Sequence, residues 1–139
     1  MTRNSYIIDC NVVVKWYLEG EEHSNEASDL LNKASKQQIE LYSPEILIIE
    51  FANVLSKYNK LKLLGATECK KYFKAFTEIY KQEVLNIISL DSSRSEVLDL
   101  ALDNKLSYFD AEYLYLSKTL QFDLITYDQQ LKRIANRYR

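Results

Sequence analysis

Two aspartates follow short apolar runs of the kind that form buried strands. Asp9 comes directly after Tyr-Ile-Ile, and Asp128 comes after Leu-Ile-Thr-Tyr. Ligand sites in an open parallel sheet lie outside the carboxyl ends of the strands. Both carboxylates are therefore predicted at that edge, where each could either bind a ligand or form an Asx-turn that caps the next helix.

Glu50 is the acid whose position is hardest to explain by folding alone. It lies in the middle of the segment EILIIEFANVL, which is predicted to be helical and is apolar on almost every side. An ionised carboxylate in such surroundings costs several kcal/mol unless it is paired. Glu50 is either at the edge of the buried stripe, reaching water, or directed at a cation.

Asp110 occupies the first turn of the aromatic segment SYFDAEYLYLS. It could simply be an acid that favours a helix N-terminus. Glu112 is two residues further on and points to another side of the helix, so we expect it at the surface. If Asp9, Glu50, Asp110 and Asp128 converge, they repel one another unless they bind a hard divalent cation such as Mg²⁺. Such a site would hydrolyse phosphodiester bonds.

Composition removes most alternative chemistries from the 139 residues. The chain has one histidine, His23, which we expect at the surface, and two cysteines, Cys10 and Cys69. This rules out His-cluster metal sites and disulfide frameworks. With only two glycines, glycine-rich phosphate loops are also excluded. Cys10 is expected to be a small buried apolar residue.

Charge is unevenly distributed, although the net charge is only −2. Residues 19–29 are acidic, whereas residues 57–81 contain seven lysines and the C-terminal tail is basic. These basic segments are either solvated helix faces or edges that bind phosphates. The candidate substrate-binding residues are Lys57, Lys60, Lys62 and Arg133.

Aromatic residues are mostly assigned to packing. Tyr113 and Tyr115 lie in an apolar helix and are expected in the core or an interface. Tyr58, Tyr72 and Tyr80 lie near the lysine-rich segment and are better candidates for stacking on nucleic-acid bases.

The apolar pattern predicts short strands at residues 6–9, 39–42, 84–90 and 123–127. Helices are expected over residues 11–18, 24–36, 44–61, 67–81, 108–120 and 128–137, and another is expected through the segment VLDLALDNK, residues 97–105. Several starts carry capping signals: Ser43 with Pro44, Thr67, Ser93 with Glu96, Ser107 and Asp128.

This alternation predicts an α/β fold, a three-layer α/β/α sandwich with a mainly parallel central sheet. No linker, repeat or apolar run of membrane-spanning length interrupts the sequence. We therefore expect one domain over residues 1–139. The start does not look like a signal peptide, and two unpaired cysteines suit the cytoplasm.

Four segments together resemble the ordered motifs of PIN-domain ribonucleases, in particular the toxins of VapBC-type toxin–antitoxin pairs. They are YIIDCNVVVKWYLEGEE, PEILIIEFANVL, SYFDAEYLYLSKTL and LITYDQQL. The family's acidic positions fall on Asp9, Glu50, Asp110 and Asp128, and its supporting polar positions fall on Asn11, Asn53 and Thr126. The resemblance implies a PIN-like fold, Mg²⁺ or Mn²⁺, cleavage of RNA, a homodimer and an antitoxin partner.

Two other functions remain open. A haloacid-dehalogenase-like phosphotransferase would use Asp9 as its nucleophile, but that fold normally has a second aspartate where this chain has Asn11. A PIN-like binding module could also have kept the fold and lost catalysis.

Overall fold

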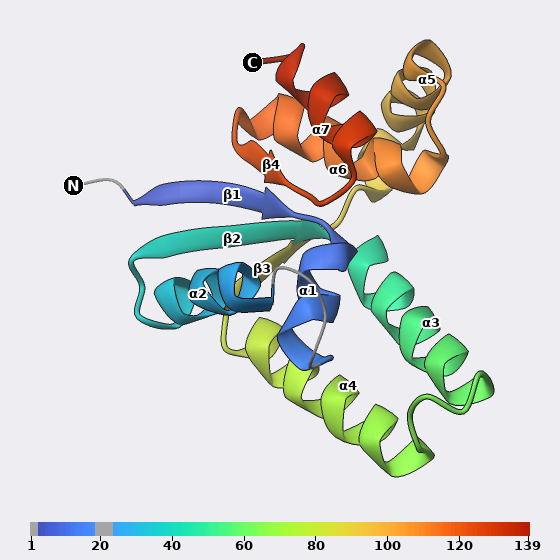
Figure 1. Ribbon diagram of the computed structural model, residues 1–139. Coiled ribbons are helices and arrows are strands. Elements are labelled where there is room, and N and C mark those ends of the chain that lie inside the picture. The colour runs from blue at the N-terminus through green and yellow to red at the C-terminus, as the bar shows by residue number, and fades with distance from the viewer. Residues whose placement is uncertain (1–2, 19–23) are drawn as a thin grey trace.

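A computed structural model describes residues 3–18 and 24–139 (Figure 1). His23 and the acidic residues Glu19, Glu21 and Glu22 lie outside these described residues. In the described parts the central sheet has four strands: β1 (Asn4–Ile8), β2 (Ile39–Pro44), β3 (Leu85–Ile88) and β4 (Asp123–Ile125). Their spatial order is β3-β2-β1-β4, and every pair is parallel. The order reverses at β1, so the switch point lies between β1 and β4.

Helices cover both faces of this sheet, as Figure 1 shows. On one face lie α5 (Arg94–Asn104), α6 (Tyr108–Leu120) and α7 (Gln129–Asn136), with α6 against β1, β2 and β4. On the other lie α1 (Cys10–Tyr17), α2 (Ser24–Ser35) and α4 (Ala66–Lys81), and α3 (Ile46–Lys60) packs against α1 and α4. A short 3-10 helix, η1 (Asp91–Ser93), precedes α5. The predicted α/β/α sandwich and its order of strands and helices are confirmed.

The core lies where the two helical layers meet the sheet. Ile7, Ile8 and Leu41 from the strands are fully buried, as are Phe51 of α3 and Tyr113 of α6. Burial on both faces explains why the strands are continuous apolar runs and do not alternate. Cys10 is buried, as the sequence predicted.

The predicted start of α3 is wrong. Ser43 does not cap the helix: its hydroxyl is buried in β2 and donates to the carbonyl of Ile8 at 2.9 Å. Strand pairing continues through Pro44, because the next amide, Glu45 N–H, donates to the Ile88 carbonyl at 3.1 Å. The helix begins at Ile46. A Ser-Pro pair is compatible with a helix start and with a strand end, and pairing with β3 decides between them.

Two further caps differ from the prediction, and two agree with it. Gly65, rather than Thr67, caps α4, and its amide donates to the Glu68 carboxylate at 3.3 Å. Ser93 is at the N-cap of α5, but its side chain makes no capping bond. Ser107 and Asp128 cap α6 and α7 as predicted.

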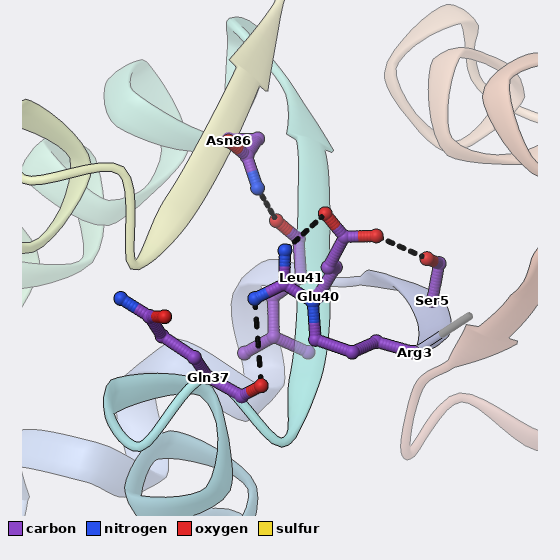
Figure 2. A network of polar contacts seen from close by, with 6 residues as sticks. All are labelled: Arg3, Ser5, Gln37, Glu40, Leu41 and Asn86. Carbon is purple, nitrogen blue, oxygen red and sulfur yellow. Dashed lines mark hydrogen bonds and ion pairs between the residues drawn. The ribbon is translucent and has the colours of Figure 1, made fainter. Parts of the chain in front are cut away.

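Polar contacts join neighbouring strands at the edge of the sheet where the strands begin (Figure 2). Arg3 pairs with Glu40 at 3.4 Å, and the Ser5 hydroxyl donates to the same carboxylate at 3.1 Å. Asn86 of β3 donates to the Leu41 carbonyl of β2 at 3.0 Å. Exposed pairs of this kind add little stability, but they join neighbouring strands. The candidate site lies at the opposite edge.

Candidate active site

The predicted acids line one cleft of about 640 Å³, which lies at the edge of the sheet where the strands end. Asp9, Glu50, Asp110 and Asp128 all line it, although they come from four separate parts of the chain. Asn11, Asn53 and Lys57 line it as well. Asp9 and Asp128 follow β1 and β4, the two strands on either side of the switch point.

Asp9 is the most rigidly held of these carboxylates. It is 7% exposed, and its Oδ1 accepts from the Cys10 amide while its Oδ2 accepts from the Thr126 hydroxyl, both at 2.7 Å. The pKa of Asp9 is raised to about 6, mainly by burial and to a smaller extent by the charges of Asp110 and Asp128, while the two hydrogen bonds oppose the rise. Asp9 therefore caps α1, which confirms the capping interpretation, and it also lines the cleft, where ligand binding stays a prediction.

The Thr126 hydroxyl is the centre of a small polar network. It donates to Asp9, and it accepts from the Asn11 side-chain amide at 3.2 Å and from the Asp128 amide at 3.0 Å. One donor and two acceptor positions are all that a hydroxyl offers, so each is used. The Asn11 carbonyl oxygen also accepts from the Tyr127 amide at 3.3 Å. The network joins the end of β1 to the end of β4.

Asp110 and Asp128 each lie at the N-terminal end of a helix, and the two carboxylates interact electrostatically. The Asp128 carboxylate is exposed and accepts from the amides of Gln130 and Leu131 at 3.0 and 3.1 Å. Asp110 is half-buried in the first turn of α6. Burial, followed by the negative charge of Asp128, raises the pKa of Asp110.

Glu50 is half-buried on α3, and its Oε1 accepts from the hydroxyl of Tyr113 at 2.6 Å. Burial raises the pKa of Glu50 to about 7 against this hydrogen bond, and the charges of Asp9, Asp110 and Glu112 add to the rise. Sequence reasoning assigned Tyr113 to the core and missed this contact. Tyr113 lies three residues after Asp110, so both are on one face of the helix, and this spacing is the signal that could have revealed a role for Tyr113 at the site.

The candidate substrate-binding residues separate in space. Lys57 lines the cleft, whereas Lys60, Lys62 and Arg133 do not. Lys15 also lines the cleft and was missed; it lies four residues after Asn11, on the same face of α1. Among the tyrosines proposed for stacking, Tyr58 lines the cleft. Tyr72 instead packs against Tyr17, and Tyr80 against Phe76.

Glu112 is not the surface residue that the sequence predicted. It is only 6% exposed, and burial raises its pKa while the charge of Arg94 opposes that rise. Spacing correctly excluded it from the cleft wall, since it is absent from the residues that line the cleft. Spacing alone could not show that neighbouring elements cover that side of α6.

The chemistry of the lining residues fits a hard divalent cation. Four carboxylates supply oxygen ligands, and three of them have raised pKa values, partly because of their neighbours' charges. Within residues 3–18 and 24–139, no three Asp, Glu, His or Cys side chains are already arranged around one metal position. The carboxylates of the cleft repel one another, and a bound cation would offset that repulsion. Burial raises the pKa of the Cys10 thiol, which makes it a poor nucleophile.

A comparison with protein-family models matches the PIN domain over residues 6–137. The chain belongs to the PIN-domain family. Among curated proteins, this PIN domain is 27% identical to Ribonuclease VapC3 of Pyrobaculum aerophilum over 125 residues, which are 90% of each chain. Among solved structures, it resembles PAE2754 from the same organism, with a TM-score of 0.70 and 18% identity. That match covers 97% of this chain and 89% of the other, and it shows the shared fold.

Proposed function

We propose that this PIN-domain protein is an endoribonuclease that depends on Mg²⁺ or Mn²⁺. The observation that carries the proposal is the meeting of Asp9, Glu50, Asp110 and Asp128 in one cleft. The ribonuclease activity in the name of the similar VapC3 supports RNA as the substrate. The PIN-domain match over residues 6–137 supports a single nuclease domain over residues 1–139.

The four carboxylates would hold the cation, which supplies charge neutralisation and activation of a water molecule. Asp9 contributes a fixed oxygen position, because the Thr126 hydroxyl and the Cys10 amide hold its carboxylate. Asn11 and Thr126 keep Asp9 and Asp128 at a constant separation across the switch point. Asn53, exposed on the wall of the cleft, is a polar contact for the substrate.

Lysine side chains on the cleft wall favour a polyanionic substrate. Lys57 extends from α3 and Lys15 from α1, so cations flank the carboxylates on two helices. A phosphate next to the cleaved bond can pair with either ammonium group. This arrangement holds the RNA backbone across the acids, which would otherwise repel it.

As a VapC-like toxin, the protein would act on RNA in the cytoplasm and would be inhibited by a cognate antitoxin protein. The name of the similar VapC3 supports this assignment. We propose a homodimer for the active form, as the family resemblance implies. No helix within the described parts of the chain is long and apolar enough to cross a bilayer.

The deciding experiment is cleavage of a fluorescently labelled single-stranded RNA by purified protein with Mn²⁺, with EDTA, and with an Asp9→Asn variant. Cleavage that needs Mn²⁺ and disappears in Asp9→Asn supports the proposal. Undiminished cleavage in EDTA, or in the variant, contradicts it. RNA binding without cleavage would identify a non-catalytic module. Hydrolysis of small phosphomonoesters that is lost in Asp9→Asn would favour a phosphotransferase.

A further inference from the structure

We infer that Tyr113 is a positioning residue for the nuclease site: its hydroxyl fixes the Glu50 carboxylate so that one oxygen remains directed at the cation. This inference rests on the proposed function, because it assigns Glu50 a role in holding the metal. Tyr113 itself touches neither RNA nor cation, since it is fully buried. It acts through Glu50.

The contact is short and charge-assisted. The Tyr113 hydroxyl lies 2.6 Å from Glu50 Oε1, within the range of about 2.5–2.7 Å expected when a hydroxyl donates to a carboxylate. Within residues 3–18 and 24–139, this is the only hydrogen bond that Glu50 accepts from a side chain. Oε2 is therefore left without such a partner, and because Glu50 is part of the cleft lining, we assign Oε2 to the cation.

Glu50 needs such a partner more than Asp9 and Asp128 do. Asp9 and Asp128 have short side chains that backbone amides hold in place. Glu50 lies in the middle of α3, where the helix's own amides already donate to carbonyls of the preceding turn, and its longer side chain has three rotatable bonds. Without the hydroxyl it could adopt several rotamers, and few of them would present an oxygen to the cation.

The position of Tyr113 also links Glu50 to a second acid. Tyr113 lies on α6 one turn after Asp110, so the helix that presents Asp110 to the cleft also holds the carboxylate of α3. Glu50 and Tyr113 are 63 residues apart in the sequence. The bond therefore fixes the distance between the two walls that carry these acids.

Tyr113→Phe tests the inference, because it removes only the hydroxyl from a buried ring. Its matched control is Tyr115→Phe, which removes the same atom from the same helix at a half-buried tyrosine outside the cleft lining. Mn²⁺ affinity is measured by isothermal titration calorimetry without RNA, so this measurement is independent of cleavage. We expect Tyr113→Phe to weaken Mn²⁺ binding about 10-fold or more, the usual effect of losing a partner that orients a ligand. Tyr115→Phe should bind as wild type does.

Kinetics separates positioning from a merely structural role. A buried hydroxyl cannot contact RNA, so Tyr113→Phe should lower kcat at subsaturating Mn²⁺ and leave KM for RNA unchanged. High Mn²⁺ should restore part of kcat. A Glu50→Gln/Tyr113→Phe double variant should lose little more Mn²⁺ affinity than Glu50→Gln alone, since both changes affect the same ligand.

Several outcomes overturn the inference. If Tyr113→Phe binds Mn²⁺ as tightly as Tyr115→Phe does, or if its loss adds fully to that of Glu50→Gln, the bond does not position a ligand. If Tyr113→Phe fails to fold, Glu50→Asp breaks the same contact by retracting the carboxylate, and wild-type Mn²⁺ affinity in that variant refutes the inference. Metal-dependent cleavage by wild type together with normal Mn²⁺ binding by Tyr113→Phe leaves the proposed function standing and removes only this inference.

Discussion

At the scale of single residues, the candidate site contains short polar side chains that both cap helices and line the cleft. Asp9 and Asp128 each cap a helix and face the cleft. The sequence therefore could not separate capping from ligand binding, because one position is compatible with both. Glu50 could be singled out because a charge stands in an apolar helix. Tyr113 was assigned to packing, since a tyrosine in an apolar helix is typical of packing, and only its spacing from Asp110 indicated another role.

The first prediction concerns Thr126, whose hydroxyl makes three hydrogen bonds in the network. Thr126→Val keeps the shape but leaves the buried Asp9 carboxylate and the Asn11 amide without this partner. We expect a loss of about 1–3 kcal/mol in the free energy of unfolding, together with weaker Mn²⁺ binding. Urea denaturation measures the stability. Thr119→Val, at an exposed position on α6, is the control and should change stability little. Equal stability of the two variants would show that the network is unimportant.

The second prediction distinguishes a cation ligand from an ordinary helix-end acid at Asp110. Two carboxylates about 6 Å apart repel by roughly 3 kcal/mol at an effective dielectric near 20, which is the order of magnitude gained by relieving one such pair. Asp110→Asn should therefore stabilise the metal-free protein, reduce the rise in Tm caused by Mn²⁺ and abolish cleavage. A helix-end acid predicts a loss of up to about 1 kcal/mol. Calorimetry with and without Mn²⁺ decides, and a less stable variant with an unchanged metal effect removes Asp110 from the site.

At the scale of helices and strands, apolar patterns were sufficient for the order of elements and insufficient for some boundaries. The runs at residues 39–42 and 84–90 correctly marked two strands. Ser43 and Pro44, however, extend β2 because Glu45 pairs with Ile88. Glu112 became buried for a similar reason, since the neighbours of α6 are contributed by distant segments. Boundaries and burial thus depend on partners that local sequence does not contain.

The third prediction uses α3, which carries one lysine in the cleft and another outside it. Lys57 lines the cleft, and Lys60 lies near the end of the same helix without reaching it. Lys57→Glu should weaken binding of single-stranded RNA. It should also make the slope of log affinity against log salt concentration shallower, by the amount expected for the loss of about one phosphate contact. Lys60→Glu carries the same charge change and should have a smaller effect. Filter binding at several salt concentrations compares them. Equal effects would mean that only overall charge matters.

At the scale of the whole molecule, large apolar side chains remain at the surface near the cleft. Ile49 on α3 is 65% exposed and Phe109 on α6 is 52% exposed. The sequence predicted that the helices over residues 44–61 and 108–120 would have more apolar surface than one sheet needs to cover. The fourth prediction is a homodimer in solution. Light scattering at tens of micromolar should give twice the chain mass of 16.4 kDa, and a monomer at that concentration contradicts it.

The last prediction links the cleft to the stability of the whole fold through pH. Folding raises the pKa of Asp9 from 3.8 to about 6 and that of Glu50 from 4.5 to about 7. Between about pH 4 and pH 7 the folded protein therefore holds more protons than the unfolded chain, so these two groups make stability fall as pH rises. Asp9→Asn should remove part of that fall in the metal-free protein.

Mn²⁺ should reverse this trend, because it competes with protons for the same carboxylates and binds the folded state. Its stabilising effect should be small at pH 4.5, should grow through pH 6 and should be largest near pH 8. Urea denaturation of wild type and Asp9→Asn at these pH values, with and without Mn²⁺, measures both effects. A wild type whose Mn²⁺ stabilisation is equal at pH 4.5 and pH 8 binds the ion somewhere other than these carboxylates. If the free energy of unfolding of the metal-free protein depends on pH equally in both proteins, folding does not raise the pKa of Asp9 as its burial implies.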